Sequence, residues 1–407
     1  MTFSLRTPAP KQLVETDLHA RARRATAAVF AAQGAAVAAV STTVPAVERQ
    51  LGLSPLTMTA LTVALALAAG AGSFAGLAAV RRLGAVAVMR GAALVAAGAL
   101  LIVGRAPDPA VATAGYLLLG LALGGIDVSA NTRATAVELH YGRSIFASFY
   151  AAWSAAGVTG ALLTAGMARL GWPVADVLTV HAALVAALAL TVRAHRLAAP
   201  ETSQPAAGRR PAPQGRGLWA RLAPFGCVLL VAYVVDSTVS AWSTVYLHRT
   251  LGASPAAAPL AYAAYQVGTV TGRACGDRLV RRIGPAAVVR TATLFTAAAL
   301  AGLAAAPGWP YAVLAAGCAG LGVAVLVPLC LASAGRLRPD AAEDVLARLN
   351  AFNYAGVLLG AGVSGALGAT GLFRLAYAVP AGLALVLLTT ARHFGASPGA
   401  ASTRVGG

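Results

Sequence analysis

The chain has 407 residues, of which 58% are hydrophobic and only 11% carry a charge, and its mean hydropathy is +0.73. Soluble domains carry about a quarter charged residues, so this composition excludes an ordinary soluble protein. The formal net charge of +18 at pH 7 would suit a nucleic-acid-binding protein, but the positions of the basic residues decide against that class.

Apolar stretches long enough to span a membrane recur along the whole chain. A spanning helix needs about 20 mostly apolar residues, and twelve stretches are of that order: 25–46, 56–79, 87–104, 111–138, 145–168, 173–192, 222–245, 257–279, 286–306, 310–333, 345–367 and 372–391. The 44 glycines suit such helices, because small residues let helix backbones approach closely in lipid. The sequence therefore predicts an all-α membrane protein with twelve transmembrane helices.

The longest hydrophilic interval divides these stretches into six and six. Its Pro, Gly, Ser and Arg content is typical of a flexible linker. The predicted organisation is an N-terminal tail, a six-helix bundle, the linker, a second six-helix bundle and a C-terminal tail, at 1–24, 25–192, 193–221, 222–391 and 392–407.

The basic residues are distributed unevenly between the two sides of the membrane. If both termini are cytoplasmic, the cytoplasmic tails and loops hold 24 of the 31 basic residues, the outer loops hold five, and Arg133 and Arg273 lie within helices. This asymmetry follows the positive-inside rule and explains the net charge without nucleic acid. Thirty of the 31 basic residues are arginine, which is typical of a GC-rich bacterial genome, so we expect a bacterial inner-membrane protein.

The two halves repeat each other at a constant offset of 200 residues. GSFAGLAAVRRLGAVAVMR at 72–90 aligns with GRACGDRLVRRIGPAAVVR at 272–290, and nine of the nineteen positions are identical. FYAAWSAAGVTGA at 149–161 faces LNAFNYAGVLLGA at 349–361 at the same offset. A fixed internal period indicates a repeated structural unit, here two pseudo-symmetric six-helix bundles.

A duplicated six-helix bundle with a cytoplasmic linker resembles the major facilitator superfamily. GRACGDRLVRRIG at 272–284 is similar to that family's signature loop, in which an Asp braces neighbouring helices and arginines hold the loop among the lipid headgroups. The first half departs from the signature, with Leu77 and Ala78 where the second half has Asp277 and Arg278. The predicted gate residues are Arg81, Arg82, Glu138, Arg273, Asp277, Arg278, Arg281 and Arg282.

A narrower resemblance rests on DVSANTRATAVE (127–138), SFYAAWSAAGVTGA (148–161) and WSTVYL (242–247). These stretches look like a bacterial branch of the superfamily that is related to sugar permeases of the fucose type. The resemblance covers nearly the whole chain apart from the tails and the linker. It implies the fold and says little about the substrate.

Asp127 is the first acid inside the predicted membrane region. Asp127, Asn131 and Glu138 fall within an arc of about 40° on one helix, whereas Arg133 points away. Since an ionisable group at membrane depth costs roughly 2.5–3.5 kcal/mol on insertion scales, Asp127 should face a cavity or a partner. It either lines an aqueous pathway, in substrate or proton handling, or belongs to a packed hydrogen-bond network.

Asp236 is the second such acid, in VAYVVDSTVSAWSTVYL at 231–247. The narrower resemblance implies two acids in this helix, but Ala241 stands where the second is expected. In the superfamily, the first, fourth, seventh and tenth helices surround the central path, and Asp127 and Asp236 lie on that set. Asp236 and Asp127 are therefore the predicted proton-coupling residues.

Polar and aromatic side chains in otherwise apolar surroundings are candidates for substrate binding, because a pocket uses a few convergent polar groups on an apolar lining. For each of them an interhelical hydrogen bond is the alternative. They are Gln33, Asn131, Tyr150, Trp153, Tyr265, Gln266, Asn350, Asn353 and Tyr354.

The function favoured by the sequence is secondary active transport of a small organic solute by alternating access, with protons as the expected coupling ion and a monomer in the lipid bilayer as the expected form. No H-E-x-x-H, G-x-S-x-G or P-loop motif occurs, and no enzyme activity, cofactor or metal is expected. A non-transporting membrane sensor and a lipid-processing enzyme are the alternatives. Sugar-type uptake and export of a drug or metabolite both remain open.

The first prediction concerns topology. In a variant whose four native cysteines are replaced, a cysteine placed within 193–221 should resist a membrane-impermeant maleimide added to intact cells, because the basic residues place this linker in the cytoplasm. A cysteine in the outer loop at Arg105 serves as the labelled control. Modification of the linker position from outside would contradict this topology.

Overall fold

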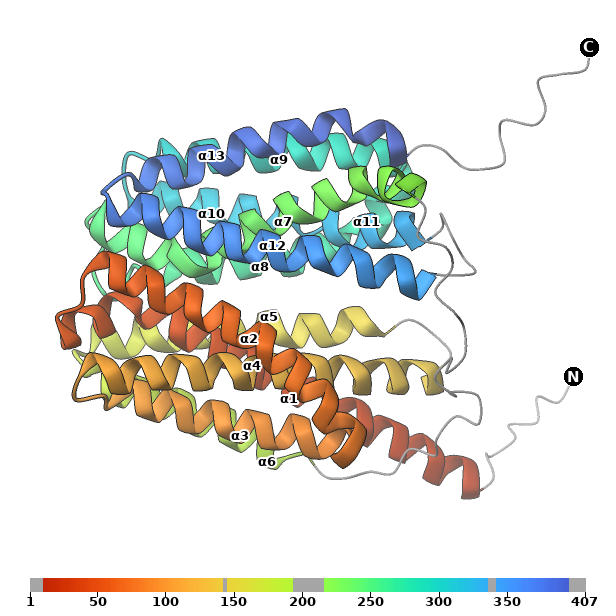
Figure 1. Cartoon of the computed structure of the whole chain (residues 1–407), viewed down its shortest axis with the longest axis horizontal. Coiled ribbons are helices and arrows are strands. Elements are labelled where there is room, and N and C mark those ends of the chain that lie inside the picture. Colours follow the sequence, from red (N-terminus) through yellow and green to blue (C-terminus); the bar gives the residue numbers. More distant parts are fainter. Residues whose placement is uncertain (1–9, 142–144, 193–215, 336–341, 395–407) are drawn as a thin grey trace, which may run out of the picture.

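The computed structural model describes residues 10–141, 145–192, 216–335 and 342–394, which form helices joined by short connections (Figure 1). The first six helices are α1 (Pro10–Leu51), α2 (Pro55–Leu83), α3 (Ala85–Gly104), α4 (Pro109–Tyr141), α5 (Phe146–Arg169) and α6 (Val174–Leu190). The remainder are α7 (Arg216–Arg249), α8 (Leu260–Ile283), α9 (Pro285–Ala304), α10 (Trp309–Val323), α11 (Leu326–Gly335), α12 (Ala342–Ala369), α13 (Phe373–Val386) and the 3₁₀ turns η2 (Leu387–Thr389) and η3 (Ala391–Phe394).

The predicted all-α membrane fold is confirmed. Within the described ranges, nine helical segments are long and apolar enough to cross a membrane, and Val174–Leu190 and Phe373–Thr389 are shorter apolar helices. These eleven and α8 correspond to the twelve predicted stretches. The α8 helix falls outside the apolar set because its second half carries a charged residue at almost every turn, beginning with Arg273.

The predicted tenth stretch is two helices rather than one. The α10 helix ends at Val323 and α11 begins at Leu326. Pro328 has no N–H to bond to the carbonyl of Ala324, and its ring collides with that carbonyl in a regular helix, which accounts for the break. In addition, α1 begins at Pro10 and α7 at Arg216, so helix extends into the predicted tail and linker.

Left-handed glycines mark the same turns in both halves. The described residues with positive φ are all glycines and form three pairs 200 residues apart: Gly52 and Gly252, Gly84 and Gly284, Gly171 and Gly371. Only glycine adopts this conformation without steric cost. Because the pairs recur at the spacing of the sequence repeat, the two halves are copies of one unit.

Close helix crossings repeat in the same way. A methyl group added at Gly72 of α2 would overlap the backbone of Leu121 in α4, and one added at Gly272 of α8 would overlap the backbone of Leu321 in α10. Small residues permit this approach between membrane helices. The pairs α2–α4 and α8–α10 are thus equivalent, which explains why both glycines belong to the repeated segment.

The two halves, α1–α6 and α7–η3, lie side by side, and α1 begins and η3 ends at the same end of the molecule (Figure 1). We call this the linker end, since α6 ends and α7 begins there. The opposite end, with the connections α1–α2, α3–α4, α5–α6, α7–α8, α9–α10 and α12–α13, is called the loop end. Contacts between the halves are made by α5 with α8, α2 with α12 and α1 with α7.

The halves meet at the loop end and separate toward the linker end. Gly365 of α12 packs on Thr59 of α2, and Thr59 is only 5% exposed. Tyr354, three turns from Gly365 on the same face of α12, is 45% exposed, and Leu77, five turns from Thr59 on α2, is 38% exposed. The ribbons of the halves diverge in the same direction (Figure 1).

The second prediction follows from the close crossings. Gly272→Ala should lower the Tm of the purified protein by several degrees, because the added methyl group forces α8 away from α10 and overpacking costs about 1–3 kcal/mol. Gly382→Ala is the matched control, since nothing lies within 4 Å of a methyl group added there. Equal Tm values for the two variants would show that the crossing tolerates a side chain.

Candidate functional site

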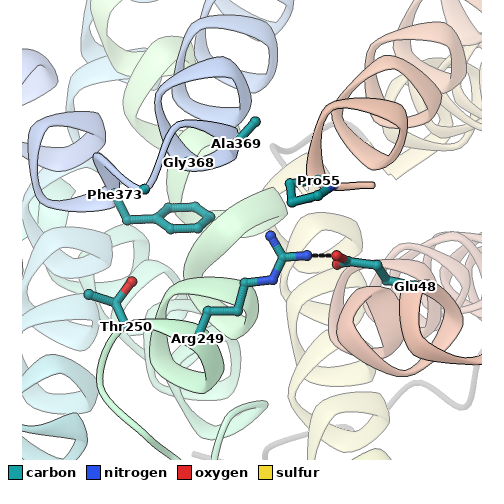
Figure 2. Close-up of a pocket in the computed structure, with 8 residues that line it drawn as sticks. Glu48, Pro55, Arg249, Thr250, Gly368, Ala369 and Phe373 are labelled. Atoms are coloured by element: carbon teal, nitrogen blue, oxygen red, sulfur yellow. Dashed lines mark ion pairs between the residues drawn. The ribbon is translucent and has the colours of Figure 1, made fainter. Parts of the chain in front are cut away.

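The loop end is held shut by charged contacts between the last residues of α1 and α7. Arg249 forms an ion pair with Glu48, and Figure 2 shows this pair bridging the halves beside a shallow pocket that Pro55 and Phe373 help to line. Arg49 Nη1 lies 2.7 Å from His248 Nε2. His248 Nδ1 lies 2.9 Å from the carbonyl of Ala253. Since a carbonyl only accepts, Nδ1 carries a hydrogen and Nε2 accepts from Arg49.

Deeper in the molecule, the N-terminal half contributes a carboxylate beside two amides. Asn131 Nδ2 donates to Asp127 Oδ1 at 3.2 Å, and Gln33, which interacts with Asp127, donates Nε2 to the carbonyl of Leu123 at 3.4 Å. The hydroxyl of Tyr150 lies 3.5 Å from Asn131 Oδ1. The structure thus brings together four predicted site residues from α1, α4 and α5, and it places Asp127 in a hydrogen-bond network that still leaves it half-buried.

The C-terminal half contributes the second carboxylate. Tyr265 of α8 donates its hydroxyl to Asp236 Oδ1 at 2.8 Å. Tyr265 is fully buried, so its hydroxyl fixes the acid against α8. Asp236 itself is half-buried, and both residues were predicted for the site.

Arg273 lies in this central region rather than at the predicted gate. Its guanidinium carbon is 5.6 Å from the centroid of the Tyr150 ring, and its Nη1 is 3.4 Å from Ser154 Oγ. It also interacts electrostatically with Asp236. Position 273 is about 15 Å along α8 from the helix end at Ile283, too far to brace the linker end.

Tyr233 lies in this central region, although the sequence did not predict it for the site. It interacts electrostatically with Tyr150, Asp236, Asp127 and Arg273, so it faces charged groups of both halves. The available signal was spacing, because a residue three positions before Asp236 shares its helix face. We refer to Gln33, Asp127, Asn131, Tyr150, Tyr233, Asp236, Tyr265 and Arg273 as the central cluster.

A chain of polar side chains crosses the interface between α5 and α8. Ser154 Oγ lies 3.5 Å from Thr269 Oγ1, and Thr269 Oγ1 lies 3.2 Å from Gln266 Oε1. Gln266 is 1% exposed and packs beside Gly157 of α5. Gln266, predicted to bind substrate, therefore lies in the closed contact between the halves instead of lining open space.

The other predicted binding residues are not joined to the central cluster by the contacts that the structure describes. Trp153 packs its backbone against Gly34. Asn353 is half-buried and Tyr354 is exposed toward the linker end. The side chain of Asn350 lies outside the described residues. No group of three or more His, Cys, Asp or Glu side chains that could hold a metal ion occurs among the residues that the structure describes.

The predicted gate residues lie near the linker end, with Arg273 excepted. Glu138 Oε2 accepts hydrogen bonds from the backbone N–H groups of Ile145 and Phe146, both at 2.7 Å. It therefore caps the first turn of α5. The side chain of Asp277 lies outside the described residues. The exposed arginines at the ends of α2 and α8 are Arg81, Arg82, Arg278, Arg281 and Arg282.

Comparison with known proteins agrees with this architecture. The model of the Major Facilitator Superfamily matches residues 225–404. An uncharacterised MFS-type transporter of Yersinia pestis is 28% identical over 285 residues, which are 70% of this chain and 71% of the relative. In sequence the chain is therefore similar to the major facilitator superfamily, over its C-terminal half by the family model and over most of its length by the relative. Its narrower resemblance to fucose-type sugar permeases stays a prediction.

Solved structures of two transporters share the fold. The nucleoside transporter NupG superposes with a TM-score of 0.67 at 15% identity, covering 93% of this chain and all of NupG. A D-xylose-proton symporter superposes with a TM-score of 0.65 at 16% identity, covering 91% of this chain and 96% of the symporter. At these identities the likeness establishes the arrangement of helices and not the solute.

The third prediction tests the closure at the loop end. In a variant without the native cysteines, Thr59→Cys should react slowly with an impermeant maleimide added from the loop end. Glu48→Gln should speed this reaction, because losing the ion pair with Arg249 favours separation of the halves. The double exchange Glu48→Arg with Arg249→Glu should restore slow labelling. Equal rates with and without Glu48→Gln would show that the ion pair does not hold the halves together.

Proposed function

We propose that the chain is a secondary active transporter that moves a small organic solute across the membrane by alternating access, with proton coupling. The observation that supports this proposal is the position of the central cluster. Asp127 comes from one half and Asp236 and Arg273 from the other, and the halves separate toward the linker end (Figure 1). Superfamily transporters bind at the interface of their repeats and rock one repeat against the other. If the linker is cytoplasmic, this structure is the inward-facing state.

Asp236 is proposed to carry the coupled proton. A carboxylate at membrane depth is expensive when ionised, so protonation lowers the cost of enclosing Asp236 between the halves. The hydroxyl of Tyr265 hydrogen-bonds to one carboxyl oxygen of Asp236 and leaves the second oxygen for a proton. One superposed structure is that of a D-xylose-proton symporter, so the shared fold is compatible with such coupling.

Asp127 is proposed to shape the same aqueous path. Asn131 hydrogen-bonds to its carboxylate. The residues proposed to contact the solute are the half-buried Gln33, Asn131, Tyr150 and Tyr233. Glu138 and the arginines at the ends of α2 and α8 are proposed to form the gate at the linker end.

The fourth prediction separates these two acids. Once a solute is found by thermal shift with sugars, nucleosides and organic acids, Asp236→Asn should abolish its accumulation in proteoliposomes under a pH gradient. The same variant should preserve binding and solute exchange, because the amide mimics the protonated acid. Asp127→Asn should reduce affinity or rate without uncoupling.

Asp176→Asn is the control, since Asp176 is an exposed acid in the first turn of α6, far along the chain from either acid. Wild-type accumulation by Asp236→Asn would exclude this carboxyl as the coupling group. A protein that binds a solute yet neither accumulates nor exchanges it would favour a membrane sensor instead.

A further inference from the structure

Arg273 holds a permanent positive charge in the central cluster. An arginine does not lose its proton in proteins, and a charge at membrane depth needs a counter-charge or water. Its described ring contact and hydrogen bond are with neutral groups, the Tyr150 ring at 5.6 Å and Ser154 Oγ at 3.4 Å, and it interacts electrostatically with Asp236. No carboxylate of the described residues forms an ion pair with it within 4.0 Å, and Tyr265 binds the nearer acid, Asp236.

Most N–H groups of the Arg273 guanidinium are therefore available to bind an acceptor. It has five N–H groups in a fixed fork, and one hydrogen bond is described for them, to a serine hydroxyl at the long distance of 3.4 Å. Such a fork matches a carboxylate in two parallel hydrogen bonds. The half-buried position of Arg273 between the halves leaves the fork within the proposed solute path.

The repeated fold of the two halves does not require the positive charge of Arg273. Position 73 is the equivalent of 273 in the first half, and Ser73 there hydrogen-bonds to the carbonyls of Ala69 and Gly124 within its own half. Both halves make the same helix crossings at Gly72 and Gly272. The arginine is thus an addition to a scaffold that folds equivalently with a serine, and a purely structural role does not account for it.

From this geometry we infer that the transported solute is an organic carboxylate, whose carboxylate group binds Arg273. The inference rests on the proposed function and specifies its substrate class. Tyr150 and Tyr233 flank the cation from α5 and α7, so the remainder of the solute lies against aromatic rings. An aromatic or otherwise apolar organic acid fits this combination better than a sugar, which offers hydroxyl groups only.

Charge balance links this substrate to protons. The ionisable groups that interact with Arg273 are Asp236 and Tyr233 on α7, Tyr150 on α5 and Tyr265 on α8. Asp127 on α4 interacts with Tyr150 and Tyr233. With both acids ionised, the cluster is net negative and repels an anion. With both protonated, it carries one net positive charge, which the solute carboxylate neutralises. Binding of the carboxylate therefore strengthens as pH falls.

The test compares carboxylates with their neutral amides on the full-length protein in detergent. Benzoate and phenylacetate should raise the Tm and quench tryptophan fluorescence, whereas benzamide and phenylacetamide should not, and the carboxylate effect should grow as pH is lowered. Arg273→Gln should weaken carboxylate binding about tenfold or more. Arg273→Lys should retain part of it, because an ammonium keeps the charge without the fork.

Arg290→Gln is the matched control, since Arg290 is exposed on α9 and belongs to no proposed site. If Arg273→Gln does not fold, the comparison of wild type with Arg273→Lys decides. Equal effects of amides and carboxylates, undiminished carboxylate binding in the Arg273 variants, or no carboxylate effect on the wild type would each overturn the inference. Transport of a neutral solute that still depends on Asp236 would overturn it while leaving the proposed function intact.

Discussion

An ionised side chain at the centre of a bilayer costs roughly 2.5–3.5 kcal/mol on insertion scales, and this cost decides where the polar residues of the chain lie. Asp127, Asp236 and Arg273 come from different helices but turn toward the junction of the two halves, where amides, hydroxyls and opposite charges surround them. The outward faces carry side chains such as Leu121, Leu162 and Leu314, which are 43–69% exposed. The helices are thus oriented by the need to remove charge from lipid.

The two halves share their turns and helix crossings, but they differ in the charged residues of the central cluster. The glycine turns and the close crossings recur 200 residues apart. The charged positions do not, since Ala36, Val327 and Ser73 stand where the other copy has Asp236, Asp127 and Arg273. A symmetric frame lets the halves rock as similar bodies, whereas unequal content places a fixed cation on one side only. The charges of the site are therefore distributed asymmetrically between the halves, although the scaffold is nearly symmetric.

Hydropathy and the internal repeat predicted the fold because the length of each apolar stretch and the 200-residue offset can be read directly from the sequence. They also singled out Asp127, Asn131, Tyr150, Asp236 and Tyr265 one by one, since a polar residue in an apolar stretch is conspicuous. Arg273 was predicted for the gate because its neighbours in sequence resemble a gate motif, but its contacts depend on how α8 is rotated against α5. The central position of Tyr233 and the burial of Gln266 depend likewise on which helix faces meet. The sequence of a single helix does not contain that information.

The tight turns at the loop end have a practical consequence for handling the protein. The α1–α2, α5–α6 and α12–α13 connections each include a left-handed glycine and span only 52–54, 170–173 and 370–372, and the longest connection on that face is 250–259. Such a face offers little extended backbone to a protease and only a small, flat epitope to an antibody. Affinity tags, fusion partners and conformation-specific binders therefore belong on the opposite face, where α1 begins and η3 ends (Figure 1).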